Sequence, residues 1–248
     1  MKLDFYYWSY QCPLHADMLQ LLKTYEDKLD IYYHDIDQNH SLAKEMNMYF
    51  PTLIVINDIH RYFEPLRKSF LEEIVKGNLP SKTPYQPMQS NVHKSGTIVP
   101  ITSSNLIQAC ECSGGCHISS SSCKKMFYQS KSQAIIGFML VDEGGSLLGG
   151  AEYISSLEVP YDIPKQASSA FMTCVYMSSE EYDAKSEPLQ TLENYLKEQY
   201  NDLYVISDET GTFPNGDISF FLSNGYMDKG IISKEEGYCT LHLLYKIL

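Results

Sequence analysis

Apolar and polar positions repeat with two different periods along the first 78 residues, and each change of period marks the boundary of an expected element. Short runs rich in Val, Ile, Tyr and Phe are typical of strands, whereas apolar residues three and four positions apart predict helices. The expected order is strand, helix, strand, helix, strand, strand, helix. The strands are expected at 3–9, 30–35, 52–58 and 60–64, and the helices at 16–29, 41–49 and 69–77.

The pattern stops at residues 79–96, which hold three prolines and little apolar periodicity and therefore predict a linker. Beyond it, two long apolar runs at 134–142 and 146–158 flank a Gly-Gly turn and predict a hairpin. Further strands are expected at 97–101, 171–177, 203–207 and 239–247, the last of them in a closing hairpin. Helical stretches are expected at 104–110, 123–130, 188–199 and 216–224. We therefore expect two domains, residues 1–78 and 97–248.

Charge and composition narrow the classes of function. The chain of 248 residues carries a formal net charge of -12, which disfavours nucleic acid or an anionic membrane as a partner. It has no apolar stretch of the roughly 20 residues that span a bilayer, and its start lacks the pattern of a signal peptide. We expect a cytoplasmic protein whose seven cysteines are mostly reduced. The oligomeric state stays open.

Cys12 lies where the first expected strand gives way to the first expected helix, and Pro13 suits a first helical position. A cysteine at a helix N-terminus feels the helix dipole, which favours the thiolate. Cys12 is therefore a redox candidate. This region resembles the thioredoxin superfamily, with Cys12-Pro13-Leu14-His15 in the place of the CxxC motif and Phe50-Pro51-Thr52 in the place of the cis-proline loop.

His15 departs from that family because it stands where a second, resolving cysteine would be. Without this partner, dithiol–disulfide exchange within the motif cannot occur, although Cys12 can still form a mixed disulfide. The alternative is a thioredoxin-like scaffold with an unreactive cysteine, because fold does not dictate function.

A second group of thiols gathers in a serine-rich stretch of the chain. It comprises Cys110, Cys112, Cys116 and Cys123, with His117 beside them. Cysteine and histidine together invite a zinc site, but the spacing lacks the paired CxxC motifs of structural zinc, so we expect no metal. Buried thiols in a helix end and loop are the alternative, and a disulfide is disfavoured in the cytoplasm.

Residues 97–248 resemble the GNAT superfamily of acyl-CoA-dependent N-acetyltransferases. Three stretches carry the resemblance: GFMLVDEGGSLLGGAEYI, FMTCVYMSSEEYDAKSEPLQTLENYL and DISFFLSNGYMDKG. It implies an α/β (α+β) fold in two domains, thioredoxin-like and then GNAT-type, the latter with a mixed, largely antiparallel sheet. It also implies acetyl-CoA as the cofactor and an amine, carried by a small molecule or a protein, as the other partner.

The resemblance also implies roles for particular residues. Glu152 matches the strand that often carries the general base, and its alternative is an ordinary solvent-facing glutamate. Val175, Tyr176 and Met177 match the strand whose backbone pairs with pantetheine in the family. Lys185 and Ser186 fall in the loop that holds the pyrophosphate there.

That loop departs from the family pattern. The family uses glycines whose N–H groups meet the phosphates at a helix start. Here Asp183 and Glu187 are acidic, and Pro188 has no N–H to donate. Phe221 stands where many members carry a tyrosine that protonates the leaving thiolate.

Three hypotheses follow from the sequence. The first is a GNAT-type acetyltransferase that transfers an acetyl group from acetyl-CoA to an amine. The second is a catalytically degenerate binding or regulatory protein that has lost the pyrophosphate loop and the resolving cysteine. The third is a thiol or metal handler in which Cys12 cooperates with the 110–123 cluster.

Overall fold

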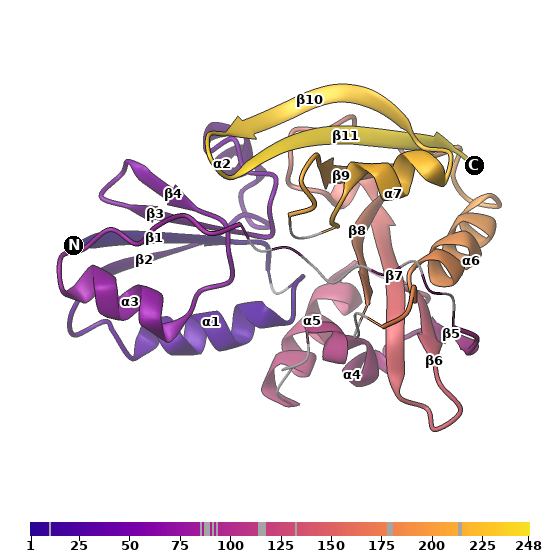
Figure 1. The fold of residues 1–248 in the computed structure, drawn as a ribbon, viewed down its shortest axis with the longest axis horizontal. Coiled ribbons are helices and arrows are strands. Elements are labelled where there is room, and N and C mark those ends of the chain that lie inside the picture. The colour runs from indigo at the N-terminus through magenta and orange to yellow at the C-terminus, as the bar shows by residue number, and fades with distance from the viewer. Residues whose placement is uncertain are drawn as a thin grey trace.

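The amino-terminal part of the chain builds a four-stranded mixed sheet (Figure 1). Its strands are β1 (Lys2–Tyr7), β2 (Asp30–Asp35), β3 (Thr52–Ile56) and β4 (His60–Tyr62), in the order β2-β1-β3-β4. The β1–β2 pair is parallel, whereas β1–β3 and β3–β4 are antiparallel. The helices are α1 (Leu14–Lys23), α2 (His40–Glu45) and α3 (Lys68–Val75), so the predicted element order is confirmed.

The computed structural model describes the chain except residues 10, 85, 87–89, 91, 93, 114–117, 132, 178–180 and 213–214, and except the side chains of 113 and 118–123. Within the described part, α1 ends at Lys23, earlier than the expected residue 29. The cause is Thr24, whose backbone N–H and hydroxyl both donate to the Leu21 carbonyl and close the helix in a tight turn.

The two faces of β1 pack against different parts of the molecule. Successive strand residues point to opposite faces. Leu3 and Phe5 join the core beneath α1 and α3. Tyr6, and Trp8 just beyond the strand, join a larger core that also contains residues of the second sheet. The two halves of the chain therefore share one apolar interior.

The carboxyl-terminal part forms a seven-stranded sheet in the order β10-β11-β9-β8-β7-β6-β5. Its strands are β5 (Thr97–Ile101), β6 (Gly137–Val141), β7 (Leu147–Ser155), β8 (Ser169–Met177), β9 (Asp202–Asp208), β10 (Met227–Glu235) and β11 (Cys239–Ile247). Every neighbouring pair is antiparallel except β8–β9. The expected mixed, largely antiparallel sheet is confirmed, and β10 and β11 form the closing hairpin that the sequence predicts without bounds for its first strand.

Four helices and two short 3-10 turns complete this half in the described residues. They are α4 (Leu106–Ala109), η1 (Cys110–Ser113), α5 (Ile118–Ser130), η2 (Ser156–Glu158), α6 (Ser186–Leu196) and α7 (Ile218–Ser223). Helix α5 begins earlier than the expected residue 123 and packs against α1 of the first half. No helix within the described ranges is both long and apolar enough to cross a membrane.

The predicted linker touches both halves of the chain. Tyr62 donates its hydroxyl to the Pro80 carbonyl at 3.0 Å, and Gln86 donates its amide to the Thr210 carbonyl at 2.9 Å. Further along, the Val92 carbonyl accepts the N–H of Asp183 at 2.6 Å. The described linker residues are therefore hydrogen-bonded to both halves of the chain. The two-domain division itself remains a prediction.

Candidate functional site

Strands β8 and β9 separate after a short parallel contact. Only Ser169–Phe171 pair with Asp202–Tyr204, and the rest of β8 has no ladder to β9. Asn215 bridges the opening: its Oδ1 accepts the Val175 N–H at 3.1 Å and its Nδ2 donates to the Ile206 carbonyl at 2.9 Å. Val175, Tyr176 and Met177, predicted to hold a cofactor, therefore border a gap in the sheet.

A β-bulge lies in β8 beside this opening. Glu152 pairs with Cys174 and Tyr153 pairs with Met172, so Thr173 is the extra residue. Gln11, from the loop before α1, donates its Nε2 to the Thr173 carbonyl at 3.4 Å. Bulges re-aim backbone groups and are frequent next to active sites. Here a residue of the first half reaches the bulge of the second.

Glu152 is fully buried on β7, so the alternative of a solvent-facing strand glutamate is wrong. Its Oε1 accepts the Lys124 ammonium at 2.8 Å and the Tyr176 hydroxyl at 3.3 Å. Its Oε2 accepts the Tyr128 hydroxyl at 2.7 Å. Lys124 and Tyr128 come from successive turns of α5, which places both on the helix face that meets β7. The sequence pattern gave no sign of this ion pair.

The electrostatics of this cluster are those of a water-poor interior. Burial alone would lower the pKa of Lys124, but the Glu152 carboxylate beside it holds that pKa well above its ordinary value. Burial, reinforced by the same carboxylate, raises the pKa of the Tyr128 and Tyr176 hydroxyls. Lys124 is thus an ammonium and both tyrosines are neutral donors at physiological pH. The arrangement holds a carboxylate ready to interact with a further cationic or protic group.

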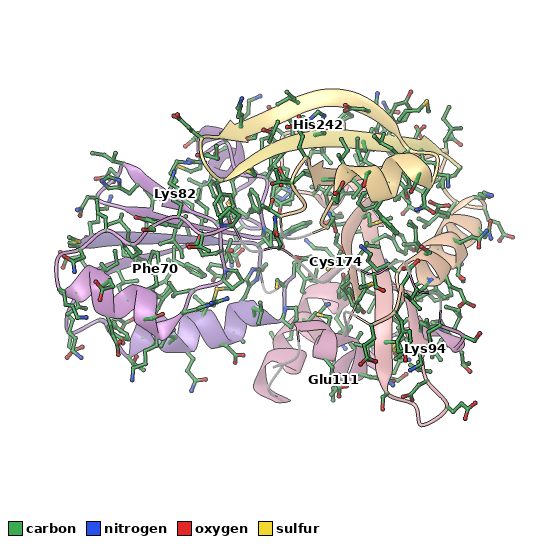
Figure 2. All side chains as sticks on the ribbon, in the orientation of Figure 1. Phe70, Lys82, Lys94, Glu111, Cys174 and His242 are labelled. Carbon is green, nitrogen blue, oxygen red and sulfur yellow. The ribbon has the colours of Figure 1, made fainter. Side chains whose placement is uncertain are left out.

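Cys174 lies directly across the ladder from Glu152 and near the middle of the molecule (Figure 2). Burial raises the pKa of this thiol well above its ordinary value, with Cys112 of η1 as a further contributor. Cys174 and Cys112 nevertheless keep part of their surface accessible, whereas Cys110 is buried. These two partly accessible thiols therefore lie on one side of the Glu152 cluster.

The structure does not test the whole cysteine cluster predicted at 110–123. Cys116 and His117, as well as the Cys123 side chain, lie outside the described residues. Within the described part of the chain, no group of three or more His, Cys, Asp or Glu side chains is arranged to hold a metal ion.

Cys12 is buried directly before α1, and His15 lies in the first turn of that helix. The His15 ring is inaccessible, and neither ring nitrogen makes a hydrogen bond of ordinary geometry. Burial lowers the pKa of His15 to about 3, only partly opposed by the Pro51 carbonyl. A neutral His15 cannot stabilise a Cys12 thiolate by charge. The redox role of Cys12 therefore stays a prediction.

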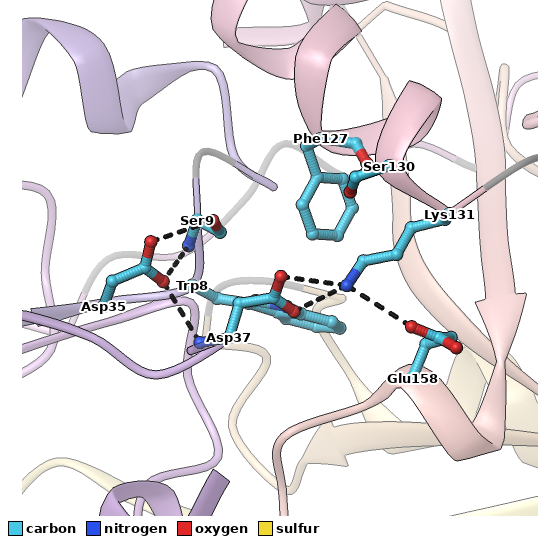
Figure 3. A network of polar contacts seen from close by, with 8 residues as sticks. All are labelled: Trp8, Ser9, Asp35, Asp37, Phe127, Ser130, Lys131 and Glu158. Atoms are coloured by element: carbon cyan, nitrogen blue, oxygen red, sulfur yellow. Dashed lines mark hydrogen bonds and ion pairs between the residues drawn. The ribbon is translucent and has the colours of Figure 1, made fainter. Parts of the chain in front are cut away.

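A polar network fixes α5 against the first half (Figure 3). Lys131 at the end of α5 donates to both Asp37 carboxylate oxygens, at 2.7 and 2.9 Å. The Trp8 indole N–H donates to Asp37 at 3.2 Å, and the Trp8 ring meets Phe127 edge to face at 5.7 Å. Phe127 lies between Lys124 and Lys131 on the helix. Helix α5 therefore provides the side chains that donate to Glu152, and it also contacts the first half.

At the start of α6, where the sequence predicts a phosphate loop, the backbone N–H groups already donate to a carboxylate of the protein. The Asp183 carboxylate accepts the backbone N–H groups of Lys185 and Ser186 at 3.0 and 3.2 Å. It also accepts the Ser186 hydroxyl at 2.5 Å. The buried Lys185 ammonium lies 4.3 Å from the centre of the Phe220 ring, and burial lowers its pKa. Both predicted residues face this internal carboxylate or an aromatic ring.

A pocket of about 770 Å³ adjoins this helix start. It extends from Ser186 and Glu187 to Asn224 at the end of α7, with Lys246 of β11 at its edge. The Lys246 ammonium is engaged by Glu193 at 2.6 Å and by the Asn224 carbonyl at 2.8 Å. The pocket is large enough for part of a nucleotide-sized group, but its one lysine is already paired.

No family model and no curated protein matches the sequence. Solved structures do show partial likeness. A GNAT-family acetyltransferase from Bacillus cereus ATCC 10987 has a TM-score of 0.43 at 12% identity, over 62% of this chain and 98% of its own. The ribosomal-protein-S18-alanine N-acetyltransferase from Escherichia coli has the same TM-score and identity, over 62% and 94%. An aminoglycoside 6'-N-acetyltransferase complexed with coenzyme A also scores 0.43 at 12% identity, over 61% and 96%.

Proposed function

We propose that the chain is an acyltransferase that moves an acetyl group from acetyl-CoA to an amine. The observation that carries this proposal is the gap between the parallel strands β8 and β9, with a bulge and a buried carboxylate beside it. An extended ligand with amide groups, such as the pantetheine arm, can pair with an unpaired strand edge as an added strand does. The backbone of Val175–Met177 would hold that arm, with Asn215 giving up the Val175 N–H that it now accepts.

The buried cluster supplies the protein groups that such a transfer needs. An acceptor amine arrives as an ammonium and must lose a proton before it can attack a thioester. We infer that Glu152 accepts that proton, because its carboxylate is buried on β7 opposite the bulged part of β8. The hydroxyls of Tyr128 and Tyr176 orient the carboxylate by donating to it. Bound acetyl-CoA would supply the thioester.

The helix start fits the cofactor less well than the gap does. The two N–H groups that would meet a pyrophosphate are bonded to Asp183. A pyrophosphate therefore has to displace this carboxylate, with Lys185 and Ser186 as its expected contacts, or lie in the neighbouring pocket. This observation favours a second candidate function: a regulatory or binding protein of the same fold in which Asp183 permanently replaces the cofactor phosphate.

Calorimetric titration of acetyl-CoA into the reduced protein separates the two candidates. Micromolar binding, together with release of coenzyme A measured by chromatography in the presence of an amine panel, supports the transferase. Pro188→Gly adds an N–H to the first turn of α6 and should tighten that binding, whereas Glu152→Gln should abolish release while leaving binding in place. Absence of binding by both the wild type and Pro188→Gly would favour the regulatory protein.

A further inference from the structure

Lys124 is a buried cation whose hydrogen-bonding capacity is only partly used. An ammonium carries three donors. Among the residues whose side chains the structure describes, the Lys124 ammonium makes one hydrogen bond, to Glu152 Oε1 at 2.8 Å, and the side chain is 1% exposed. Buried polar groups are normally satisfied. The remaining donors therefore point to an oxygen acceptor that the site receives from outside.

Glu152 can in turn accept one more hydrogen bond than it does. A carboxylate offers about four lone-pair sites, and Glu152 accepts three hydrogen bonds, from Lys124, Tyr128 and Tyr176. The pair is electrically neutral as a unit. A ligand with a single positive charge would be attracted by Glu152 and repelled by Lys124. A ligand that carries both charges side by side would be attracted by both.

The surroundings limit the size of that ligand. Gln11 and Cys12 of the first half cover the bulge side of the cluster, and each is less than 9% exposed. Helix α5 covers the other side and is tied to the first half through Lys131 and Asp37. The partly accessible thiols Cys112 and Cys174 line the remaining side. These buried surroundings favour a small molecule over a polypeptide chain, and the thiol side favours an apolar group.

We propose that the acceptor of this acyltransferase, and hence the ligand of the Lys124–Glu152 pair, is a free α-amino acid with an apolar side chain. This proposal rests on the proposed function for its chemistry. The amino acid's ammonium would meet Glu152 and its carboxylate would meet Lys124, so that the four charges alternate in sign. Charge-assisted hydrogen bonds of this kind are about twice as strong as neutral ones.

The transfer that follows from this placement balances as an ordinary aminolysis. The amine nitrogen forms a bond to the acyl carbon while the bond from that carbon to sulfur breaks. The amino acid's ammonium loses two protons in all. One passes to Glu152 and then to solvent, and the other ends on the sulfur, which leaves as a thiol. The amino acid's carboxylate stays on Lys124 throughout.

The test begins with binding alone, so that it does not depend on acetyl-CoA. The standard L-amino acids are titrated into the full chain by calorimetry. L-leucine is then compared with isoamylamine, which lacks the carboxylate, and with isocaproate, which lacks the amine. The expected result is that leucine binds on the order of tenfold or more tighter than either analogue, because each loses one charge-assisted contact. Equal binding of leucine and isoamylamine, or no binding of any amino acid, overturns the proposal.

Variants of the pair assign that binding to its two charges. Lys124→Met should bring leucine affinity down to that of isoamylamine, whereas Lys125→Met, at the exposed neighbouring lysine, should change nothing. Because Lys124→Met leaves a buried carboxylate unpaired and can impair folding, the neutral double variant Lys124→Met/Glu152→Gln serves as the second test. It should fold and fail to discriminate leucine from its analogues; retained discrimination overturns the proposal.

The outcomes also separate this proposal from the acyltransferase itself. Acetyl transfer to isoamylamine as fast as to leucine leaves the transferase standing and overturns the amino-acid acceptor. Leucine binding that depends on Lys124, with no acetyl-CoA binding, supports the zwitterion site and removes the transferase.

Discussion

Asp183→Asn removes the charge that occupies the start of α6 while keeping the shape of the side chain. Asp183 accepts the N–H groups of Lys185 and Ser186 and the Ser186 hydroxyl. An asparagine oxygen can still accept from the backbone, so the substitution isolates the effect of the negative charge. If acetyl-CoA uses this helix start, its phosphates now compete with a neutral group and should bind more tightly.

The size of the effect follows from the geometry. A unit charge about 4 Å from another costs about 1 kcal/mol in water and about 4 kcal/mol at the effective dielectric of a protein surface. Acetyl-CoA affinity should therefore rise at least about fivefold, since 1.4 kcal/mol corresponds to a factor of about ten. The same substitution weakens a favourable contact with the helix dipole, so the protein should lose about 0.5–1 kcal/mol of folding stability.

The assay is calorimetric titration of acetyl-CoA, with thermal unfolding recorded on the same samples. Asp142→Asn is a matched control, because Asp142 also accepts two backbone N–H groups, from Gly144 at 2.9 Å and Ser146 at 2.8 Å, in the β6–β7 turn. It should cost similar stability without changing the affinity for acetyl-CoA. Affinity that is unchanged or weaker in Asp183→Asn would refute the idea that this carboxylate occupies the phosphate position.

Three further outcomes are expected. Gly149→Ala should lower the free energy of unfolding by about 1–3 kcal/mol, measured by urea denaturation, because an added Cβ would clash with the carbonyl oxygens of Ala184 and Tyr176. The control Gly144→Ala should cost little, because a Cβ there meets no backbone atom. Lys131→Met leaves the Asp37 carboxylate without its cation and should lower stability by about 1–3 kcal/mol relative to Lys125→Met; equal midpoints would contradict the network. His15→Leu should make the free energy of unfolding less sensitive to acid. The pKa of His15 is about 3 in the folded protein and about 6.5 in the unfolded chain, so the wild type loses about 1.4 kcal/mol of stability per pH unit as the pH falls between these values. The difference in unfolding free energy between the two proteins should show that slope.

The sequence predicted the elements whose signal is local. Strands such as β6 and β8 are predominantly apolar, and their runs stand out from the turns around them. Strand β10, the first strand of the expected closing hairpin, could not be given bounds for the opposite reason. It lies at the edge of the sheet, most of its side chains are exposed, and its sequence MDKGIISKE alternates too weakly to mark where a strand begins and ends. Pairing with β11, not its own pattern, makes it a strand.

The sequence predicts the strand residues of the candidate site but not their partners, for a related physical reason. Glu152 and the strand at 175–177 were named because they lie on apolar strands that resemble a known family. Their partners come from distant segments: Lys124 is 28 positions from Glu152, and Gln11 is 162 positions from Thr173. Nothing in the local pattern around Lys124 distinguishes it from the exposed Lys125 beside it. Only the packing of α5 on β7 makes one a buried ammonium and the other a surface charge.

The packing of α5 also changes how the first half of the chain should be regarded. Composition suggests two units joined by a proline-containing linker. In the structure, one apolar core continues from Trp8 through Phe127 into the second sheet. Lys124 lies on α5 and Lys131 directly follows its last residue, so the segment that contacts Asp37 of the first half is continuous with the helix that carries the cation facing Glu152. The first half also contributes to the surroundings of the buried pair, because Gln11, in the loop before α1, donates to the Thr173 carbonyl in the bulge of β8.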